Sequence, residues 1–460
     1  MAEHFRTERD TMGEMRVPAD ALWGASTARA VENFPISGLR FQRPFIRALG
    51  LIKSAAAKVN GEQGHIPSEM ARAIEEAARA VAEGRHDGQF VVDIYQTGSG
   101  TSTNMNANEV IARLAGAHPN DDVNRGQSSN DVIPTAMHVA AAEEVERRLL
   151  PALEGLEASL ARKAREFMDI VKIGRTHLQD AVPMRLGQEF LGYARQAAAS
   201  RERIRAVMPW IYELPLGGTA VGTGLNAPAG FAAAAIAEIA RRTGLPFVEA
   251  PNHFEAQAAK DAVCMLSGAL RTTAVALTKI ANDVRWLGSG PRCGLGELKL
   301  PAVQPGSSIM PGKVNPVIAE SLLMACAQVI GHDAAITWCA AAGSTFELNV
   351  MMPVMAWNLL DSIALVAAGA RNFQEKLVDG LEADRARAEG LVEQSLAMAT
   401  VLAPEIGYEK AAALVKEAYR TGRTVREVAR EKSGIAEETL GRLLDPRRQA
   451  GAPPREPADR

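Results

Sequence analysis

Long helical patterns dominate the sequence after Pro134 and constrain its fold more than any other feature. In the clearest of them, over residues 253–287, apolar residues recur at alternating steps of three and four. Such a heptad seam lets long helices pack side by side at a shallow angle. The sequence therefore predicts a mainly α-helical protein built around a bundle of long helices. The seam consists of Val263, Leu266, Leu270, Leu277, Ile280, Val284 and Leu287, with Thr273 filling the gap.

Five such patterns are present, and each is longer than the usual three turns. Asn252 stands three residues before Glu255, where an N-cap residue of the third helix is expected. Helices of this length do not easily form a compact monomer, whereas packing them against those of other subunits buries their second faces. We therefore expect a homo-oligomer, with a bundle inside one chain as the alternative. The patterns cover residues 135–168, 187–208, 253–287, 317–340 and 353–376.

The chain of 460 residues is too long for one ordinary hydrophobic core. We predict three domains. Residues 1–126 form a mixed, mostly helical domain, and residues 127–384 form the long-helix bundle. Residues 385–460 form a small domain of shorter helices, one of which starts at a Thr424–Glu427 capping box.

Composition narrows the class of protein further. Hydrophobic residues make up 47% and charged residues 23% of the chain, and the net charge is −3, without the basic excess of proteins that bind nucleic acids or membranes. The longest apolar stretch, around 322–343, contains a glutamine, a histidine and an aspartate, so it reads as a buried helix and not a membrane span. The four cysteines form no CxxC pair and are expected to be buried and reduced. Because the N-terminus also lacks an apolar signal segment, we expect a cytoplasmic protein.

The segment GSSIMPGKVNP, from Gly306 to Pro316, carries the densest set of chemical groups. Its glycines and prolines predict a loop, and Pro316 can begin the following helix. Successive backbone N–H groups near a glycine can bind an anion. An ordinary polar connector is the alternative, but the pattern G-S-x-x-M-P-x-K-x-N is long and specific. The loop presents two hydroxyls, an ammonium and an amide, from Ser307, Ser308, Lys313 and Asn315.

This loop resembles the signature loop of the fumarase/aspartase superfamily. The resemblance implies a mainly α, three-domain fold whose central helices assemble into a tetrameric helical core. It also implies active sites that form where three subunits meet. Further segments look like those of class II fumarases in the same order along the chain: TGSGTSTNMNANEV, HPNDDVN, QSSNDVIPTAMH, GRTHLQDAVP, LGGTAVGTGLN, KIANDVRWLGSGPRCG, FELNV and IGYEKAA.

The activity that the resemblance implies is the reversible hydration of fumarate to L-malate, a step of the tricarboxylic acid cycle. Removing the proton beside one carboxylate of malate places a second negative charge on that group, which becomes an aci-carboxylate. The site needs donors aimed at this charge, a base for the carbon-bound proton and an acid for the leaving hydroxyl. Cationic donors can meet these needs without a metal.

The resemblance also assigns a role to each candidate residue. Ser307 corresponds to the catalytic base, with its alkoxide stabilised by loop N–H groups and Lys313. His177 corresponds to the histidine that works on the water or hydroxyl, and Glu320 to the carboxylate that keeps it basic. Lys313 and Asn315 match donors that hold a substrate carboxylate. The other implied substrate contacts are Ser99, Gly100, Thr101, Ser128, Ser129, Asn130, Thr176 and Ser308.

Some of these residues have plainer alternatives. The run QSSND is also typical of a turn or a helix cap, and Glu320 also suits a first-turn acid facing the helix dipole. A second, peripheral anion site is implied at the HPND motif, where the chain departs from the family. Only LAGA separates Arg113 from this motif, and no basic residue directly precedes it. The site comprises His118, Pro119, Asn120 and Asp121.

Two patterns resemble binding sites for a metal ion and for a dinucleotide, but the surrounding sequence does not support either site. His177 and Asp180 are spaced for chelation, yet no further side chain completes a ligand set. The segment GTGLNA (222–227) fits a dinucleotide-binding pattern, but no parallel-sheet pattern surrounds it. We therefore expect no metal and no cofactor.

Aspartate ammonia-lyase, which forms fumarate and ammonia, is the alternative reaction within the superfamily. HPND, SSND, GPRCG with Cys293 and GKVNP with Gly312 favour water over ammonia, whereas MMPV after FELNV is closer to aspartases. The argininosuccinate and adenylosuccinate branches need substrate contacts that the chain does not display. A non-catalytic scaffold predicts damage at the catalytic positions, all of which carry the expected residues.

Overall fold

A computed structural model describes residues 4–452. The fold is mainly α-helical, as predicted, and its strands pair only into two-stranded sheets among these residues. The chain divides into two compact units, and the predicted three-domain division stays a prediction. Unit 1 comprises Met1–Pro151, Ser200–Ala274 and Ala325–Ala367, and unit 2 comprises Ala152–Ala199, Val275–Met324 and Ala368–Arg460.

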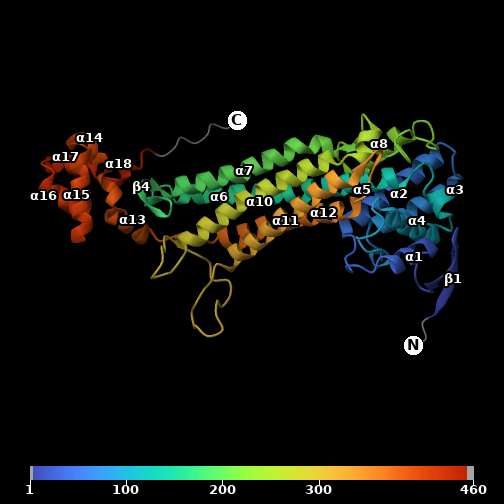
Figure 1. The fold of residues 1–460 in the computed structure, drawn as a ribbon, viewed down its shortest axis with the longest axis horizontal. Helices are drawn as coiled ribbons and strands as arrows, with labels where there is room; N and C mark the ends of the chain where they lie inside the picture. Colours follow the sequence, from blue (N-terminus) through green and yellow to red (C-terminus); the bar gives the residue numbers. More distant parts are fainter. Residues whose placement is uncertain (1–3, 453–460) are drawn as a thin grey trace. The chain divides into compact units, whose positions relative to one another are not determined.

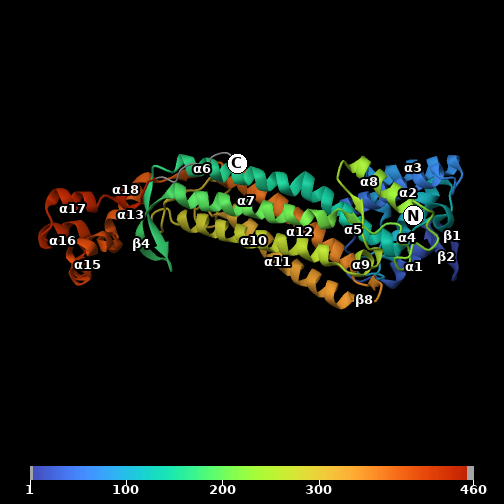
Figure 2. The same ribbon diagram turned by 90° about the horizontal axis from the view of Figure 1, so that it is seen from above.

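The predicted long helices are present, and each unit contains parts of them. Figures 1 and 2 show that these parts run side by side within each unit. Every residue of the predicted seam in α10 is buried, including Thr273, so the heptad interpretation is confirmed. The long elements are α5 (Ser129–Glu144), η3 (Val145–Leu149), α6 (Leu150–Glu166), α7 (Leu186–Ile211), α10 (Asp261–Leu287), α11 (Val317–Gly343) and α12 (Met352–Phe373), which η4 (Gln374–Val378) continues.

The helix predicted over 253–287 is interrupted, which the periodicity did not indicate. α9 (His253–Ala258) ends before α10 begins, and Asn252 caps α9 as predicted, since its side chain accepts the N–H of Glu255 at 3.0 Å. At the break, the buried ammonium of Lys260 donates to the carbonyls of Ala256, Gln257 and Ala259. These bonds satisfy carbonyls that the end of a helix leaves without partners.

Two further boundaries differ from the sequence interpretation. The polar segment QTGSGTSTNMNANE, interpreted as turn-rich, contains the start of α4 (Thr101–Ala115). Its asparagines are buried and form hydrogen bonds. Asn106, for example, donates to the carbonyl of Gln89 at 2.9 Å. The helix predicted from 135 begins instead at Ser129, because a capping box of Ser128 and Asp131 starts it before Pro134.

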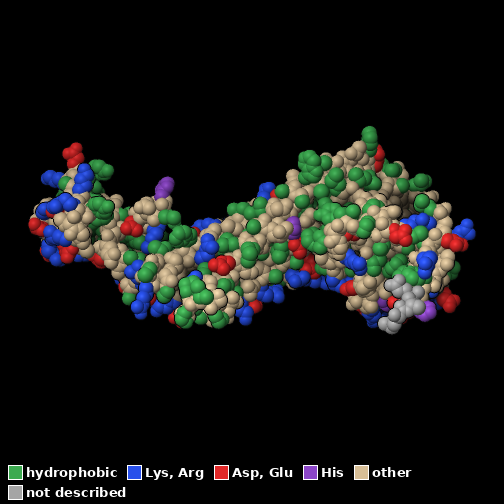
Figure 3. Space-filling model, turned by 60° about the horizontal axis from the view of Figure 1, so that its bottom comes forward, with side chains coloured by type: hydrophobic (Ala, Val, Ile, Leu, Met, Phe, Trp, Pro, Cys, Tyr) green, Lys and Arg blue, Asp and Glu red, His purple; other side chains and the backbone are tan. Residues whose placement is uncertain are grey.

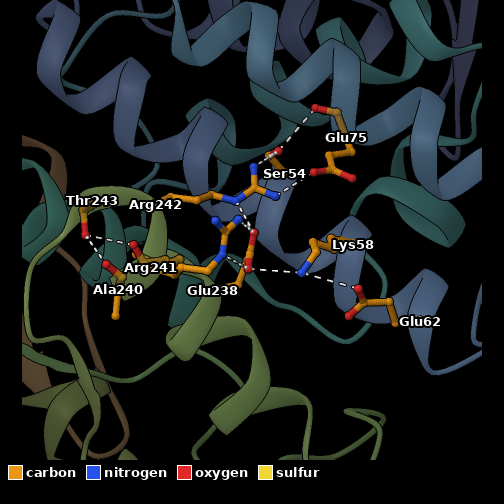
Figure 4. Close-up of polar contacts among 10 residues, drawn as sticks. Ser54, Lys58, Glu62, Glu75, Glu238, Ala240, Arg241, Arg242 and Thr243 are labelled. Carbon is orange, nitrogen blue, oxygen red and sulfur yellow. Dashed lines mark hydrogen bonds and ion pairs between the residues drawn. The ribbon is translucent and has the colours of Figure 1, made fainter.

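Unit 1 is organised around α2 (Arg43–Glu62), which packs against α3 (Ser68–Ala82), α5 and α8 (Phe231–Thr243). Ion pairs join α8 to both neighbours: Glu238 of α8 pairs with Lys58 of α2, and Arg242 of α8 pairs with Glu75 of α3 (Figure 4). The other elements of this unit are β1 (Phe5–Asp10), β2 (Gly13–Pro18), α1 (Ala25–Asn33), η1 (Asp87–Gln89), η2 (Pro119–Val123), β5 (Glu213–Leu214), β6 (Val248–Glu249), β8 (Ser344–Thr345) and β9 (Leu348–Asn349).

Unit 2 contains a β-hairpin and a group of short helices with a shared core. The hairpin is formed by β3 (Val171–Thr176) and β4 (Gln179–Arg185), and Val171 and Ile173 of β3 pack into that core. The predicted Thr424–Glu427 capping box is present. The other elements are β7 (Leu298–Lys299), β10 (Glu382–Ala383), α13 (Arg385–Gln394), η5 (Leu396–Leu402), α14 (Ala403–Ile406), α15 (Tyr408–Thr421), α16 (Val425–Lys432), α17 (Glu437–Leu443) and α18 (Pro446–Gln449).

Three helices are long and apolar enough, by length and composition alone, to cross a membrane: Asp261–Leu287, Val317–Gly343 and Met352–Val378. Buried polar residues link them within unit 1. Asp333 of α11 accepts from Ser267 at 2.7 Å and pairs with Arg271 of α10 at 2.8 Å, and His332 bonds Ser362 of α12 at 3.1 Å. The stretch 322–343, predicted as a buried helix, is only partly buried, since 39% of the apolar window of α11 is covered.

The cysteine prediction is also only partly right. Cys326 and Cys339 are buried, whereas Cys264 is half-buried and Cys293 is exposed. All four are free thiols.

Candidate active site

The predicted substrate contacts of unit 1 lie at the N-termini of two neighbouring helices. α4 begins after Gly100, and α5 begins after Ser128. The two ends are in contact: the amide of Asn104 in α4 donates to the hydroxyl of Ser129 at 3.0 Å, and a Cβ on Gly100 would lie 2.8 Å from the side chain of Ile133. Helix N-termini carry partial positive charge and free N–H groups. This pair of helix ends is therefore suited to a carboxylate ligand.

The segment before α4 is held closely against the FELNV segment. The N–H of Met352 donates to the carbonyl of Gly98 at 3.0 Å, and a Cβ on Gly98 would lie 1.6 Å from the carbonyl oxygen of Val350, so only glycine fits there. Next to it, the hydroxyls of Ser99 and Thr101 are bonded to each other at 2.8 Å. The two hydroxyls thus lie together at the start of α4.

The start of α5 is both a helix cap and a junction with the glycine-rich loop 217–224. Ser128 accepts the N–H of Asn130 and donates its own N–H to Asp131, so the cap interpretation of QSSND is confirmed. The fully buried carboxylate of Asp131 also accepts from the N–H groups of Gly217 and Thr219, at 3.0 and 2.9 Å. Burial raises the pKa of Asp131 to about 6, while these N–H groups act in the opposite direction.

The residues of the 217–224 loop were not among the predicted site residues. The segment LGGTAVGTGLN served only as a mark of resemblance, yet its carbonyl at Ala220 accepts from the amide of Asn130 at 2.8 Å. Asp131 could have been found from the sequence, because an acid three residues after a serine is the pattern of a capping box. Its bonds to Gly217 and Thr219 could not, because they join segments 86 and 88 residues apart.

In unit 2, His177 occupies the tip of the β3–β4 hairpin. Thr176 ends β3 and Gln179 begins β4, so His177 and Leu178 form the turn. Their φ angles of 57° and 59° are left-handed, a conformation that costs of order 1–3 kcal/mol outside glycine and is usually filled by Asn-Gly in such turns. Thr176 and His177 are both exposed. An exposed histidine held in a costly conformation is a mark of a functional site.

The base of this hairpin is fixed by buried charges. Arg175 makes two hydrogen bonds, of 2.9 and 3.1 Å, to the carboxylate of Glu297, which is fully buried. The buried ammonium of Lys172 lies 3.4 Å from the same carboxylate and 3.3 Å from that of Glu189. Paired and hydrogen-bonded charges of this kind hold one geometry, so they fix the strand that leads to His177.

The Gly306–Pro316 segment is a loop without helix or strand, as predicted, and it closes on itself. The N–H of Gly306 donates to the carbonyl of Lys313 at 2.7 Å, and the amide of Asn315 donates to the carbonyl of Gly306 at 2.6 Å. The hydroxyl oxygen of Ser307 accepts the N–H groups of Ile309 at 3.2 Å and Met310 at 2.9 Å. Two backbone donors therefore point at the atom that would carry the charge of a serine alkoxide.

The other predicted residues of this part of the site are not joined to one another by hydrogen bonds or ion pairs within the single chain. Ser308 and Lys313 are exposed on the loop, and Glu320 lies in the first turn of α11. Over residues 4–452, no hydrogen bond or ion pair joins His177 to Glu320 or Lys313 to Ser307. The same part of the chain contains no group of three or more His, Cys, Asp or Glu side chains that could hold a metal ion. The His177–Glu320 pair stays a prediction.

The predicted second anion site begins η2. The ring Nδ1 of His118 accepts the N–H of Asp121 at 3.1 Å, so it caps this turn, and both side chains are exposed. Beside it lies a cavity of about 450 Å³ lined by Arg9, Arg113 and His118, among others. Arg113 therefore shares a cavity with the HPND motif, although no basic residue directly precedes the motif in the sequence.

Comparison with known proteins identifies the class. Residues 13–331 match the family described as Lyase, and residues 398–448 match the one described as Fumarase C C-terminus. The crystal structure of recombinant class II fumarase from Schistosoma mansoni superposes with a TM-score of 0.94 at 41% identity, covering 97% of this chain and 99% of that one. Fold, paired helix ends and serine loop thus define a lyase of the fumarase class.

Comparison with curated sequences identifies the family within this class. Fumarate hydratase class II of Ralstonia nicotianae is 52% identical over 458 residues, covering 97% of this chain and 99% of the relative. The enzyme of the same name from Mycobacterium tuberculosis is 54% identical over 452 residues, covering 96% and 95%. The chain belongs to the class II fumarate hydratase family. The resemblance stated from the sequence is therefore confirmed.

Proposed function

We propose that this chain catalyses the reversible hydration of fumarate to L-malate and that the Ser307 loop carries out the proton transfer at carbon. The observation that carries the proposal is the pair of backbone N–H groups that already point at the Ser307 hydroxyl. A serine becomes a base only if its alkoxide is stabilised, and preorganised N–H donors supply that stabilisation without reorganising during the reaction.

In the direction of fumarate, the Ser307 alkoxide takes the proton from the carbon beside one carboxylate of malate. The electron pair of the C–H bond moves into that carboxylate, which becomes a doubly charged aci-carboxylate held by Lys313 and Asn315. The electrons then return to form the double bond, the C–O bond on the opposite face breaks, and His177 protonates the leaving hydroxyl to water. Hydration of fumarate follows the same steps in reverse.

The two helix N-termini of unit 1 bind the substrate. Ser99, Gly100 and Thr101 come from the start of α4, and Ser128, Ser129 and Asn130 from the start of α5. Backbone N–H groups, hydroxyls and an amide together offer the hydrogen-bond donors that a dicarboxylate needs. Thr176 and Ser308 complete the contacts, and His118–Asp121 forms a separate, outer anion site.

The proposed enzyme is a homotetramer in the cytoplasm, with each active site shared by three subunits. Support for the tetramer comes from large apolar side chains that the single chain leaves uncovered on its long helices. Trp286 of α10 and Met324 and Trp338 of α11 are 50%, 69% and 69% exposed. On the face drawn in Figure 3, hydrophobic side chains reach the surface at several places between charged ones. Burying such helix faces against other copies removes them from water.

The test of this function is a comparison of two substrates. The purified protein is incubated with L-malate and, separately, with L-aspartate, and the formation of fumarate is followed by ultraviolet absorbance. We expect turnover of L-malate and none of L-aspartate. Turnover of L-aspartate alone would identify an ammonia-lyase and contradict the proposal.

A further inference from the structure

A fully buried lysine lies behind the two helix ends that form the substrate site of unit 1. Lys53 belongs to α2, and its ammonium donates to the side-chain oxygens of Asn124 at 2.9 Å and Gln127 at 3.0 Å. Both acceptors are neutral amides, and among residues 4–452 Lys53 makes no ion pair. Buried charges are usually paired with an opposite charge, so this ammonium is an exception that needs an explanation.

The lysine is connected to the substrate site through shared hydrogen bonds. The oxygen of Asn124 that accepts from Lys53 also accepts from the amides of Asn104 and Asn108 in α4, each at 3.2 Å. Asn104 donates in turn to the hydroxyl of Ser129 at the start of α5. Gln127, the other acceptor, directly precedes Ser128. The ammonium therefore orients residues of both helix ends.

Among residues 4–452, no acid contacts the ammonium of Lys53. Asp131 is the charged group that acts on Lys53 electrostatically, yet its carboxylate is occupied by the N–H groups of Ser128, Gly217 and Thr219. The other cations of α2 have acidic partners: Arg43 pairs with Asp87, Arg47 with Glu143 and Lys58 with Glu238. The two groups that accept from the Lys53 ammonium, the side-chain oxygens of Asn124 and Gln127, are uncharged. Burial lowers the pKa of Lys53 to about 7.

We propose that Lys53 is a positioning residue whose buried charge is balanced by the substrate carboxylate bound at the N-termini of α4 and α5. This inference rests on the proposed function, because it assumes a dicarboxylate at these helix ends. Two helix N-termini and one ammonium then act on the same anion, and water screens the charge of the ammonium only weakly because Lys53 is fully buried. Without ligand, the protonated form of Lys53 has no paired anion and is disfavoured; with ligand, the substrate carboxylate balances its charge.

The proposal predicts that ligand binding stabilises the protonated form of Lys53. At pH 8 the free protein holds Lys53 mostly neutral, since burial lowers its pKa to about 7. A bound dianion raises that pKa, so binding takes up a proton. At pH 6 Lys53 is protonated both before and after binding, so it no longer contributes to the uptake of protons.

Calorimetry of succinate, an unreactive dicarboxylate, measures this uptake directly. Titrations at pH 8 in two buffers with different heats of ionisation give the number of protons taken up. We expect the wild type to take up more than about half a proton beyond the Lys53→Met variant, and the difference to vanish at pH 6. Lys58→Met, which removes the other lysine of α2, should keep the wild-type uptake. Equal uptake by wild type and Lys53→Met would overturn the proposal, because the proton would then go to another group such as Asp131.

Steady-state kinetics with L-malate supplies a second readout and guards against a variant that fails to fold. Lys53→Met should raise KM at least about tenfold while kcat stays within about threefold, because the charge acts on binding. Gln127→Glu keeps the lysine but places a carboxylate beside it, and it should raise KM in the same way. A purely structural lysine predicts the opposite for Gln127→Glu, namely an unchanged KM. Malate turnover by the wild type tests the proposed function separately.

Discussion

At the scale of single residues, the proposed roles of Ser307 and His177 depend on the local backbone geometry, which residue types alone do not predict. The sequence pointed to Ser307 and His177 by resemblance, and the structure adds a physical reason for each. Ser307 faces two backbone N–H groups, and His177 sits in a left-handed turn that the fixed base of its hairpin maintains. Neither the N–H directions nor the turn could be inferred from residue types, because histidine and leucine are not usual in such a turn.

Replacement of Ser307 by alanine tests the proposed base. Loss of the hydroxyl removes the alkoxide but keeps the loop backbone, so kcat for L-malate should fall by about 10²–10⁴-fold with little change in KM. Ser307→Thr keeps a hydroxyl on the same backbone and should retain more activity than the alanine variant. Initial rates of fumarate formation measure both effects, and thermal melting checks that the variants are folded. An alanine variant as fast as the wild type would remove Ser307 from the mechanism but leave the family assignment intact.

At the scale of elements, hydrophobic periodicity was a good guide and polar segments were a poor one. The seam of α10 was predicted residue by residue, because burial on one face follows directly from the heptad spacing. The helix α4 was not recognised, because its asparagines become favourable only when distant partners such as the carbonyl of Gln89 accept their bonds. The break before α10 was missed for the same reason, since it depends on where the Lys260 ammonium finds its acceptors.

The contact of α8 with α2 gives a pH-dependent prediction at this scale. Glu238 is nearly buried, and it pairs with Arg241 at 2.7 Å, Arg242 at 2.6 Å and Lys58 at 3.1 Å (Figure 4). The hydrogen bond from Arg241 is the main cause that lowers the pKa of Glu238 from 4.5 to about 2. Because the folded pKa lies below the unfolded one, this stabilisation is present above pH 4.5 and is lost as the pH falls toward 2.

Glu238→Gln should therefore lower the free energy of unfolding by about 3 kcal/mol at pH 7, the lower end of the range for breaking a buried ion pair. The difference from the wild type should shrink as the pH falls from 4.5 toward 2, because the glutamate of the unfolded chain is protonated in this range while the folded one stays charged. Glu62→Gln is a matched control, because Glu62 pairs with the same Lys58 at 3.4 Å but is mostly exposed, and such pairs contribute at most about 1 kcal/mol. Urea denaturation at pH 7 and pH 3 measures both variants. A constant difference across this range would show that Glu238 does not act through its charge.

At the scale of the whole molecule, the proposed active site requires an assembly of several chains. The expectation of a homo-oligomer came from helices too long for one compact core, and large side chains such as Trp338 are indeed left exposed on them. Helix periodicity predicts that such faces exist. Helix periodicity does not specify which surface of another subunit covers these faces, because that depends on the complementary shapes of the two surfaces.

Mixing two inactive variants tests whether active sites are shared. Asn130→Ala damages the helix ends and Ser307→Ala damages the loop, so each variant alone should be nearly inactive. When both are produced together, sites that draw each segment from a different, intact subunit should recover about a quarter of the wild-type activity. Light scattering should show four chains per particle. No recovery, or an active monomer, would argue against sites built from several subunits.

The proposed mechanism adds water to fumarate across opposite faces of its double bond. The most direct measurement is one proton NMR spectrum of fumarate incubated with the enzyme in D2O that contains an ammonium salt. We expect malate as the only product, with one deuterium in a single configuration, because the serine and histidine act from fixed and opposite sides. Aspartate among the products, or deuterium in both configurations, would contradict it.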